Sequence, residues 1–451
     1  MASARAAIIL AAGQGTRMRS STPKVLHKVG GRALLDWAIA VAGALGCEKT
    51  IVVASPLAPA VSAHAAQRLG EAAVALQAEP KGTGDAVKAA RGALAGFEGD
   101  VVILYGDTPL IRRETVEAMF AARAQKGGLV ALAFEAADPT GYGRFVTGED
   151  GAVLRIVEHR DATDAERAIR LCNSGVFVAD CAMLFDLLQM VRNDNAKGEH
   201  YLTDIVGLGR SAGFKTHLVI GAESEMLGVN SRVELAAAEA AHQARVRRAA
   251  LEAGVTMIAP ETVYFSHDTS IAADVTIEPN VFFGPGVTVE SGAVIKAFSH
   301  LEGAHIGEGA SVGPFARLRP GASLGAKVKI GNFVEVKNAT FGEAAQASHL
   351  SYIGDASVGA RANLGAGVIT CNYDGFDKHR TEIGAGAFIG SDTALVAPVS
   401  VGEGAYTGSG SVITKDVPAD ALAVARGRQR AIEGWAAKFR AAKLSARENK
   451  A

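Results

Sequence analysis

A repeat of six residues runs through the chain from about residue 271 to residue 418. Each unit begins with an aliphatic residue, usually followed by Gly, and has a small residue in fifth place, as in Ile306-Gly-Glu-Gly-Ala-Ser and Ile330-Gly-Asn-Phe-Val-Glu. A period of six residues matches neither the period of a helix nor the alternation of a strand. Three hexapeptides laid along three flat faces make one coil of a parallel β-helix. The repeat therefore predicts a left-handed parallel β-helix of several coils rather than an ordinary globular core.

The aliphatic residues fix the register of this β-helix. They predict that Ala347 points inward, so that Ser348 and His349 face a corner and the exterior. The register breaks once, and residues 370–382 form an inserted loop, which in a solenoid is usually functional. The aliphatic positions are 271, 277, 283, 289, 295, 301, 306, 312, 318, 324, 330, 336, 341, 347, 353, 358 and 364. Three of the steps between them are five residues long instead of six, which indicates single deletions at corners.

Residues 5–230 have a different pattern. Short β-rich runs, at 6–10, 50–54, 101–105 and 129–134, alternate with Ala-rich helical stretches. This alternation predicts an α/β domain with a mainly parallel, Rossmann-like sheet.

The domain layout follows from these two patterns. We expect an α/β domain over 1–230, a helical linker over 231–254 opened by a capping box at Ser231–Glu234, and the β-helix over 255–430. A C-terminal helix over 431–451 places Trp435 and Phe439 on one side. We expect these aromatic rings to pack on the last coil or on a neighbouring subunit rather than on a membrane.

Composition narrows the class of protein. The net charge of −1 gives no reason to expect nucleic acid binding. The four cysteines have neither a paired nor a metal-ligand spacing, which is typical of a reduced cytoplasmic protein. The apolar run at 6–12 is too short to span a bilayer, and no secretory signal is visible. We therefore expect a cytoplasmic protein without membrane or nucleic acid partners.

A glycine-rich loop, Leu10-Ala-Ala-Gly-Gln-Gly-Thr-Arg-Met18, follows the first β-rich run. Such a turn lets backbone N–H groups approach a phosphate chain at a helix N-terminus. Met18 replaces the third Gly of the dinucleotide fingerprint, which argues against NAD. Arg17 and Lys24 add two cations beside the loop, which suits a nucleoside triphosphate.

Further motifs follow along the chain: Gln77-Ala-Glu-Pro-Lys-Gly-Thr83, Tyr105-Gly-Asp107-Thr-Pro, Gly141-Tyr-Gly143-Arg, Ile156-Val-Glu158-His, Asn173-Ser-Gly and Gly228-Val-Asn230-Ser-Arg. With the glycine-rich loop and the hexapeptide repeat, they make nearly the whole chain resemble one family. This family is the bacterial bifunctional N-acetylglucosamine-1-phosphate uridylyltransferase and glucosamine-1-phosphate N-acetyltransferase.

The resemblance implies a nucleotide site in the α/β domain. Asp107 and Asn230 would be the protein ligands of Mg²⁺, and Lys24 and Arg17 would neutralise phosphate charge. The sugar phosphate needs no general base to attack the α-phosphorus, so catalysis is positioning plus charge neutralisation. The residues implied to bind UTP or UDP-N-acetylglucosamine are Leu10, Ala11, Ala12, Gly13, Lys24, Gln77, Gly82, Thr83, Tyr105, Gly106, Asp107, Gly143, Glu158, Asn173 and Asn230.

The resemblance also implies an acetyltransferase site on the β-helix. His349 would be the base that removes a proton from the ammonium of glucosamine 1-phosphate, so that the amine can attack acetyl-CoA. The inserted loop with Asn372, Tyr373 and Lys378 would reach over a neighbouring subunit of a homotrimer. The residues implied to bind glucosamine 1-phosphate are Arg319, Lys337, Tyr352 and Asn363, and those implied to bind acetyl-CoA are Ala366, Asn372, Tyr373, Ser391, Ser409 and Arg426.

Two alternatives are weighed against this interpretation. A sugar-1-phosphate nucleotidyltransferase can carry a β-helix that only scaffolds or regulates, as in ADP-glucose-forming enzymes. The inserted loop and the Arg319, Lys337, His349 and Tyr352 group argue against that. A purely structural β-helix would show flat Thr-rich faces and no α/β domain.

Overall fold

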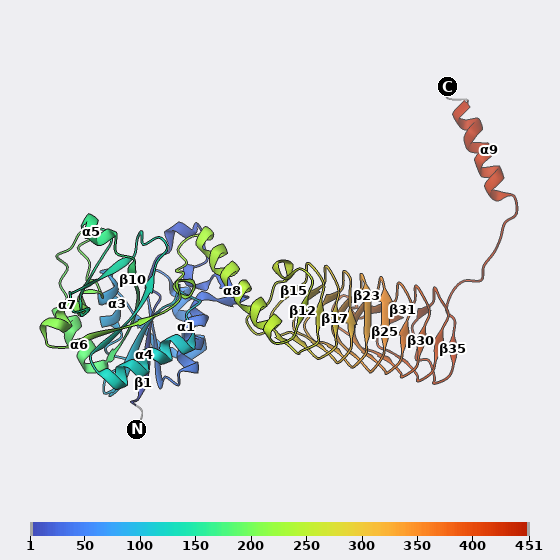
Figure 1. Cartoon of the computed structure of the whole chain (residues 1–451). Helices are drawn as coiled ribbons and strands as arrows, with labels where there is room; N and C mark the ends of the chain where they lie inside the picture. Colours follow the sequence, from blue (N-terminus) through green and yellow to red (C-terminus); the bar gives the residue numbers. More distant parts are fainter. Residues whose placement is uncertain (1–2, 449–451) are drawn as a thin grey trace. The chain divides into compact units, whose positions relative to one another are not determined.

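The structure is a computed structural model that describes residues 3–448 (Figure 1). It separates into two compact units, Met1–Arg248 and Ala249–Ala451. The last three residues of the expected C-terminal segment lie outside the described residues.

A nine-stranded sheet forms the first unit, in the order β11-β7-β10-β6-β1-β4-β5, with β8 and β9 attached beside β10. The pairs β1–β4, β1–β6, β4–β5 and β7–β11 are parallel. This confirms the predicted α/β fold. The sequence did not indicate β10, which lies antiparallel to β6 and β7. The strands are β1 (Arg5–Leu10), β4 (Lys49–Ala54), β5 (Val74–Leu76), β6 (Asp100–Tyr105), β7 (Leu129–Glu135), β8 (Gly143–Thr147), β9 (Val153–Val157), β10 (Leu171–Asp180) and β11 (Thr216–Ile220), with a small hairpin of β2 (Lys28–Val29) and β3 (Arg32–Ala33).

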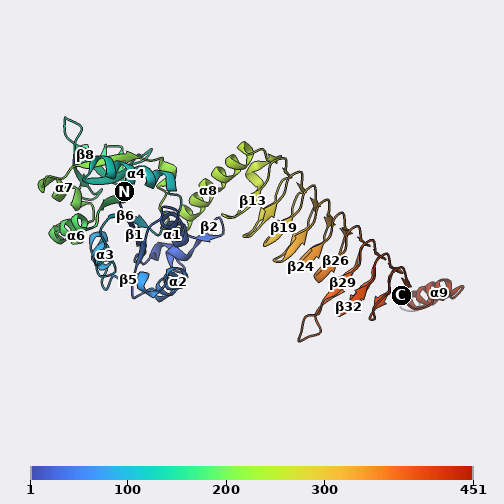
Figure 2. The same ribbon diagram turned by 90° about the horizontal axis from the view of Figure 1, so that it is seen from below.

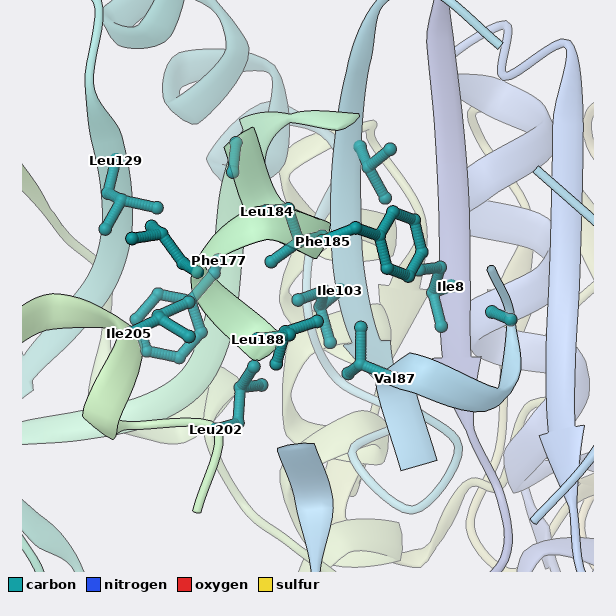
Figure 3. Packing of buried hydrophobic residues seen from close by; sticks show 14 of the residues in the cluster. Ile8, Val87, Ile103, Leu129, Phe177, Leu184, Phe185, Leu188, Leu202 and Ile205 are labelled. Atoms are coloured by element: carbon teal, nitrogen blue, oxygen red, sulfur yellow. The ribbon is translucent and has the colours of Figure 1, made fainter. Parts of the chain in front are cut away.

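Helices cover both faces of this sheet. Leu184 and Leu188 of α6 lie near Ile103 of β6 and Val87 of α3 in one buried cluster (Figure 3). A second cluster packs α1, α2 and α4 on the other face. With both faces buried, the central strands are apolar throughout, as parallel strands usually are. The helices are α1 (Leu34–Ala44), α2 (Pro59–Leu69), α3 (Thr83–Ala89), α4 (Arg113–Lys126), α5 (Asp164–Arg167), α6 (Cys181–Met190) and α7 (Asp204–Ser211).

The predicted linker helix is α8 (Arg232–Glu252). Ser231 Oγ accepts a hydrogen bond from the Glu234 backbone N–H at 3.3 Å, as a capping box requires. Glu234 differs from that motif, because its carboxylate accepts from the N–H of Asn230 at 2.7 Å rather than from that of Ser231. The boundary between the two units, after Arg248, falls inside α8. The first part of this helix belongs to the first unit, where Ala238 packs into a buried cluster.

The second unit is a β-helix with three faces, visible as stacked coils in Figures 1 and 2. All of its inter-strand pairs between coils are parallel. We call its three faces A, B and C, and their strands are given below. The long strands β24 and β26 cross the corner between faces C and B and take part in both faces. Face A holds β12 (Thr256–Met257), β14 (Thr276–Ile277), β17 (Val294–Ile295), β20 (Ser311–Val312), β23 (Lys329–Asn332), β25 (Gln346–His349), β27 (Asn363–Leu364), β30 (Phe388–Ile389), β33 (Tyr406–Thr407) and β35 (Leu422–Ala423). Face B holds β13 (Ser270–Ile271), β16 (Thr288–Val289), β19 (Ala304–Ile306), β22 (Ala322–Leu324), β29 (Thr381–Ile383) and β32 (Val399–Val401), and face C holds β15 (Phe282–Phe283), β18 (His300–Leu301), β21 (Arg317–Leu318), β24 (Glu335–Phe341), β26 (Tyr352–Val358), β28 (Ile369–Cys371), β31 (Ala394–Val396) and β34 (Val412–Ile413).

The predicted register is confirmed. From Ile277 to Leu364 every predicted inward position is buried, and only Ile271, in the first coils, is half-buried. The β-helix begins before the repeat becomes visible in the sequence, because β12 already pairs with β14.

The predicted inserted loop lies between β28 and β29 and projects from the coils (Figure 2). Its root is tied to the β-helix, since Asn372 is buried, whereas Tyr373 and Phe376 are exposed.

The C-terminal helix α9 (Trp435–Glu448) is present as expected. Trp435 and Phe439 stack on each other with ring centroids 5.1 Å apart. Both rings remain about half exposed, so packing on the last coil or on a neighbouring subunit stays a prediction.

Candidate active sites

The glycine-rich loop follows β1 at the carboxyl end of the central strands. Gly15 has a φ of +62°, and a Cβ there would lie 2.5 Å from Cβ of Lys24, so this loop requires glycine. The prediction that a helix begins directly after this loop is wrong. Only a 3-10 turn, Thr16–Met18, follows, because the segment is interrupted by Ser20, Ser21, Thr22 and Pro23 before α1 begins.

Lys24, Asp107 and Asn230 meet at the end of β6. The Lys24 ammonium lies 2.5 Å from Oδ2 of Asp107 and 3.0 Å from Oδ1 of Asn230. Lys24 is almost completely buried. The two oxygens that we expected to bind a metal ion therefore already converge on one cation.

A cavity of about 270 Å³ opens beside this cluster. Gln77 is held there by its own contacts, since Nε2 donates to the Gly82 carbonyl at 3.0 Å and to Asp85 at 2.9 Å. Gly106 lies next to the cavity and donates its N–H to the carbonyl of Leu10. Arg17 is exposed and does not line the cavity. The predicted residues that line it are Leu10, Ala11, Ala12, Gly13, Lys24, Gln77, Gly82, Thr83, Tyr105 and Asp107, joined by Gln14 and Glu199, which the sequence did not single out.

Gly143, Glu158 and Asn173 form a second group. A Cβ on Gly143 would lie 3.5 Å from Oε1 of Glu158 and 3.7 Å from Cβ of Asn173. Gly143 pairs directly with Asn173, which lies where the register of β10 shifts. The structure thus brings together the three residues expected to hold the sugar.

A cavity of about 450 Å³ adjoins Glu158 and contains residues that sequence reasoning missed. Thr203 donates a hydrogen bond to Oε1 of Glu158 at 3.0 Å. Burial raises the pKa of Glu158. Burial, together with the negative charges of Glu158, Asp194 and Asp161, raises the pKa of Asp204 to about 6.

His349 lies at the corner between faces A and C. It is exposed, as predicted, and its Nδ1 lies 2.8 Å from Oδ1 of Asn332 in the preceding coil. Because an amide oxygen only accepts, Nδ1 carries the proton in this arrangement and Nε2 is left to accept one. Asn332 precedes His349 by 17 residues, about one coil.

Arg319 and Lys337 lie in successive coils, and each faces a carboxylate that the sequence did not single out. Arg319 pairs with Glu335 at 2.8 Å, and Lys337 Nζ lies 4.0 Å from Oδ2 of Asp355. Asn372 Nδ2 lies 3.5 Å from the Tyr352 hydroxyl.

Asn363 lies on face A, between Gln346 and Phe388, whereas Lys337 and Tyr352 lie on face C. One chain therefore does not bring all the expected sugar-phosphate residues to one face.

The expected acetyl-CoA residues follow the corner of His349 toward the C-terminus. Backbone hydrogen bonds join this corner coil by coil, from Gly367 to His349, from Asp392 to Ala366 and from Gly410 to Ser391. Arg426 donates to the carbonyl of Ser409 at 2.6 Å. Ala366, Ser391, Ser409 and Arg426 thus form one edge that leads away from His349, while Tyr373 is exposed on the inserted loop.

Neither site contains a dense cluster of metal ligands. Within residues 3–448, no group of three or more His, Cys, Asp or Glu side chains is arranged to hold a metal ion. Among the same residues, no helix has both the length and the apolar character needed to cross a membrane.

Comparison with known proteins agrees with both halves of the chain. Residues 7–170 match the MobA-like NTP transferase domain, and residues 303–338 and 380–415 match the bacterial transferase hexapeptide family. The chain is 62% identical over 450 residues to the bifunctional protein GlmU of Maricaulis maris, covering 100% of this chain and 99% of that protein. It is 56% identical to the GlmU of Caulobacter vibrioides, covering 99% and 96%. It is also 56% identical to that of Paracoccus denitrificans, covering 94% of each.

Fold and sites together define a nucleotidyltransferase joined to a hexapeptide-repeat acyltransferase. At these identities over nearly the full length, the chain belongs to the family of bifunctional GlmU proteins. It is an enzyme with uridylyltransferase and acetyltransferase activities.

Proposed function

We propose that the chain acetylates glucosamine 1-phosphate with acetyl-CoA and then joins the product to UTP, which releases pyrophosphate and UDP-N-acetylglucosamine for cell-wall synthesis. The observation that carries this proposal is the separation of two sets of polar groups. The Lys24, Asp107 and Asn230 cluster belongs to the first unit, and the His349 and Asn332 pair belongs to the second.

Nucleotidyl transfer in this family uses a divalent metal ion, and we propose Mg²⁺ held by Asp107 and Asn230. The fit rests on the Lys24 ammonium, which already draws one carboxylate oxygen and one amide oxygen to a single point. Few protein ligands suit Mg²⁺, because triphosphate oxygens and water complete its coordination. When bound, the ion neutralises charge on the phosphates.

The protein's own groups then position the reaction. Lys24 reaches the phosphates from the floor of the nucleotide cavity, and Gly143, Glu158 and Asn173 hold the acetylated sugar. An oxygen of the sugar phosphate attacks the α-phosphorus, and the bond to the β-phosphate breaks. Since that oxygen is already anionic near neutral pH, no base is required.

Acetyl transfer needs a base, because an ammonium cannot attack a thioester. We propose that Nε2 of His349 takes one proton from the ammonium, while Asn332 holds the ring in the required tautomer. The amine then bonds to the carbonyl carbon, the carbon–sulfur bond breaks, and the thiol of coenzyme A leaves with a proton. Arg319 and Lys337 would hold the sugar phosphate, and the edge from Ala366 to Arg426 would hold acetyl-CoA.

The acetyltransferase site is proposed to be completed in a homotrimer. His349 is exposed on one corner, and Asn363 lies on a different face from Lys337. Tyr373 and Phe376 project from the inserted loop with most of their surface uncovered. A ring of three chains would let one chain's loop cover another chain's His349. The four cysteines are all free, which supports a cytoplasmic location.

The test is one assay with the purified protein. With UTP, Mg²⁺, acetyl-CoA and glucosamine 1-phosphate, UDP-N-acetylglucosamine should form. Chelation of the metal with EDTA should leave N-acetylglucosamine 1-phosphate as the product. Failure to form either product would overturn the proposal. A protein that transfers uridylyl but never acetyl groups would favour the alternative of a scaffolding β-helix.

A further inference from the structure

A polar ladder follows the corner between faces C and B of the β-helix. Asn338, Asp355 and Asn372 succeed each other at intervals of 17 residues. Asn338 Nδ2 donates to Oδ1 of Asp355 at 2.6 Å, and Asn372 Nδ2 donates to Oδ2 of the same carboxylate. Asp355 is only 8% exposed. One buried carboxylate therefore ties three successive coils together.

The backbone at this corner is left-handed in successive coils, but the residue type changes along it. Gly303 and Gly321 occupy the corner in the two preceding coils, with φ values of +52° and +83°. Asn338 and Asp355 adopt the same left-handed region, at +44° and +47°. Glycine does so without cost, whereas other residues lose some stability there. The change from Gly to Asn and Asp begins in the coil that carries Lys337.

Two ammonium groups face the Asp355 carboxylate. Lys337 Nζ lies 4.0 Å from Oδ2 of Asp355, and the neighbouring Lys337 lowers the pKa of Lys378. Burial alone would raise the pKa of Asp355. The hydrogen bonds from Asn338 and Asn372 and the charges of the two lysines outweigh burial, and the pKa lies below its usual value.

We propose that Asp355 is a positioning residue of the acetyltransferase site. It holds Lys337 in the direction of the sugar phosphate and fixes Asn372, where the inserted loop begins. Two lysines against one carboxylate leave one net positive charge, which suits a phosphate group. Asp355 itself touches no substrate. This inference rests on the proposed acetyl transfer to a sugar phosphate.

The experiment compares Asp355→Asn with Asp274→Asn. Asp274 also has a left-handed backbone, with a φ of +62°, and lies on the same β-helix, but it is exposed and remote in sequence from the candidate site. Asp355→Asn keeps the shape and removes the charge and one acceptor. We expect it to raise KM for glucosamine 1-phosphate by about 10- to 100-fold, the range of a lost charge-assisted hydrogen bond, because Lys337 holds the phosphate, and to change KM for acetyl-CoA by less than about 3-fold. Asp274→Asn should match the wild type.

Uridylyl transfer by the same preparations measures the amount of active first unit, and acetyl-CoA binding serves as the folding control for the second unit, which carries the substitution. The double variant Asp355→Asn/Lys337→Met should lose less than the two single variants together, since part of the effect of Asp355 passes through Lys337. Fully additive losses, or a wild-type KM for glucosamine 1-phosphate in Asp355→Asn, would overturn the inference. If wild-type protein shows no acetyl transfer, the proposed function fails, and this inference with it.

Asn338→Gly provides a second route if Asp355→Asn does not fold. It restores the glycine of the preceding coils and removes only one of the two amide donors. We expect KM for glucosamine 1-phosphate to rise by about 2- to 10-fold, less than in Asp355→Asn, because the carboxylate and the Asn372 donor remain. An unchanged KM for glucosamine 1-phosphate in this variant would contradict the role of the ladder.

Discussion

Asp204 has a carboxyl group whose surroundings disfavour its charged form. It is half-buried in the first turn of α7, beside the cavity that contains Glu158. Its pKa is raised from an ordinary value of 3.8 to about 6, first by burial and then by the charges of Glu158, Asp194 and Asp161. The folded protein therefore binds this proton more tightly than the unfolded chain. It follows that folding stability falls as pH rises from about 4 to 6 and stays reduced above that range.

The size of this effect can be worked out for Asp204→Asn. A difference of about two in pKa corresponds to about 3 kcal/mol. Asp204 is only half-buried and gains some stability from the start of a helix, so about 1–1.5 kcal/mol is a better value. Removing the charge should therefore raise the melting temperature of the first unit by about 2–6 °C at pH 8. At pH 4.5, where the wild-type carboxyl is already protonated, less than half of the gain should remain.

Differential scanning calorimetry of both proteins at the two pH values measures this gain. Asp186→Asn is the matched control, because Asp186 lies exposed on the neighbouring helix α6. It should change the free energy of unfolding by less than about 0.5 kcal/mol at either pH. A gain for Asp204→Asn that is equal at pH 8 and pH 4.5 would refute the electrostatic argument.

Three further predictions concern the two sites. Gly143→Ala places a Cβ 3.0 Å from Ile156 and 3.5 Å from the Glu158 carboxylate, so KM for N-acetylglucosamine 1-phosphate should rise about 10-fold or more. Gly43→Ala is the control, because its Cβ would have no atom within 4 Å, and it should leave this KM unchanged. His349→Ala should lower acetyl transfer by about 10²- to 10⁴-fold, and Asn332→Ala by only about 2- to 10-fold with intact acetyl-CoA binding. Equal losses would show that Asn332 does more than orient the ring. Mixed trimers of His349→Ala chains and chains without residues 372–378 should regain part of the acetyl transfer, and inactive mixed trimers would place loop and base in one chain.

The sequence was sufficient to predict the β-helix because its core demands one aliphatic residue per six. Ala347 is buried and His349 exposed, as the register requires. The same register could have found Asn332, because a spacing of 17 residues places it one coil before His349. Asp355 could have been found in the same way, as the residue between Asn338 and Asn372.

The α/β domain was harder to predict in detail. The buried strands were found from their apolar runs, but β10 was not, and neither was the shift in its register that sets Asn173 beside Gly143. Thr203 and Asp204 belong to a stretch without any periodic pattern. Lys24 and Asn230 lie 206 residues apart, and the folded structure shows that the Lys24 ammonium contacts both Asn230 and Asp107.

The most direct test of the account is whether the two activities separate by mutation. Asp107→Ala removes the carboxylate that faces Lys24, and nothing in the second unit. We predict that it abolishes uridylyl transfer while acetyl transfer from acetyl-CoA stays near the wild-type rate, and that His349→Ala does the reverse. A well-folded Asp107→Ala protein that loses both activities to the same extent would contradict the claim that the chain carries two independent sites.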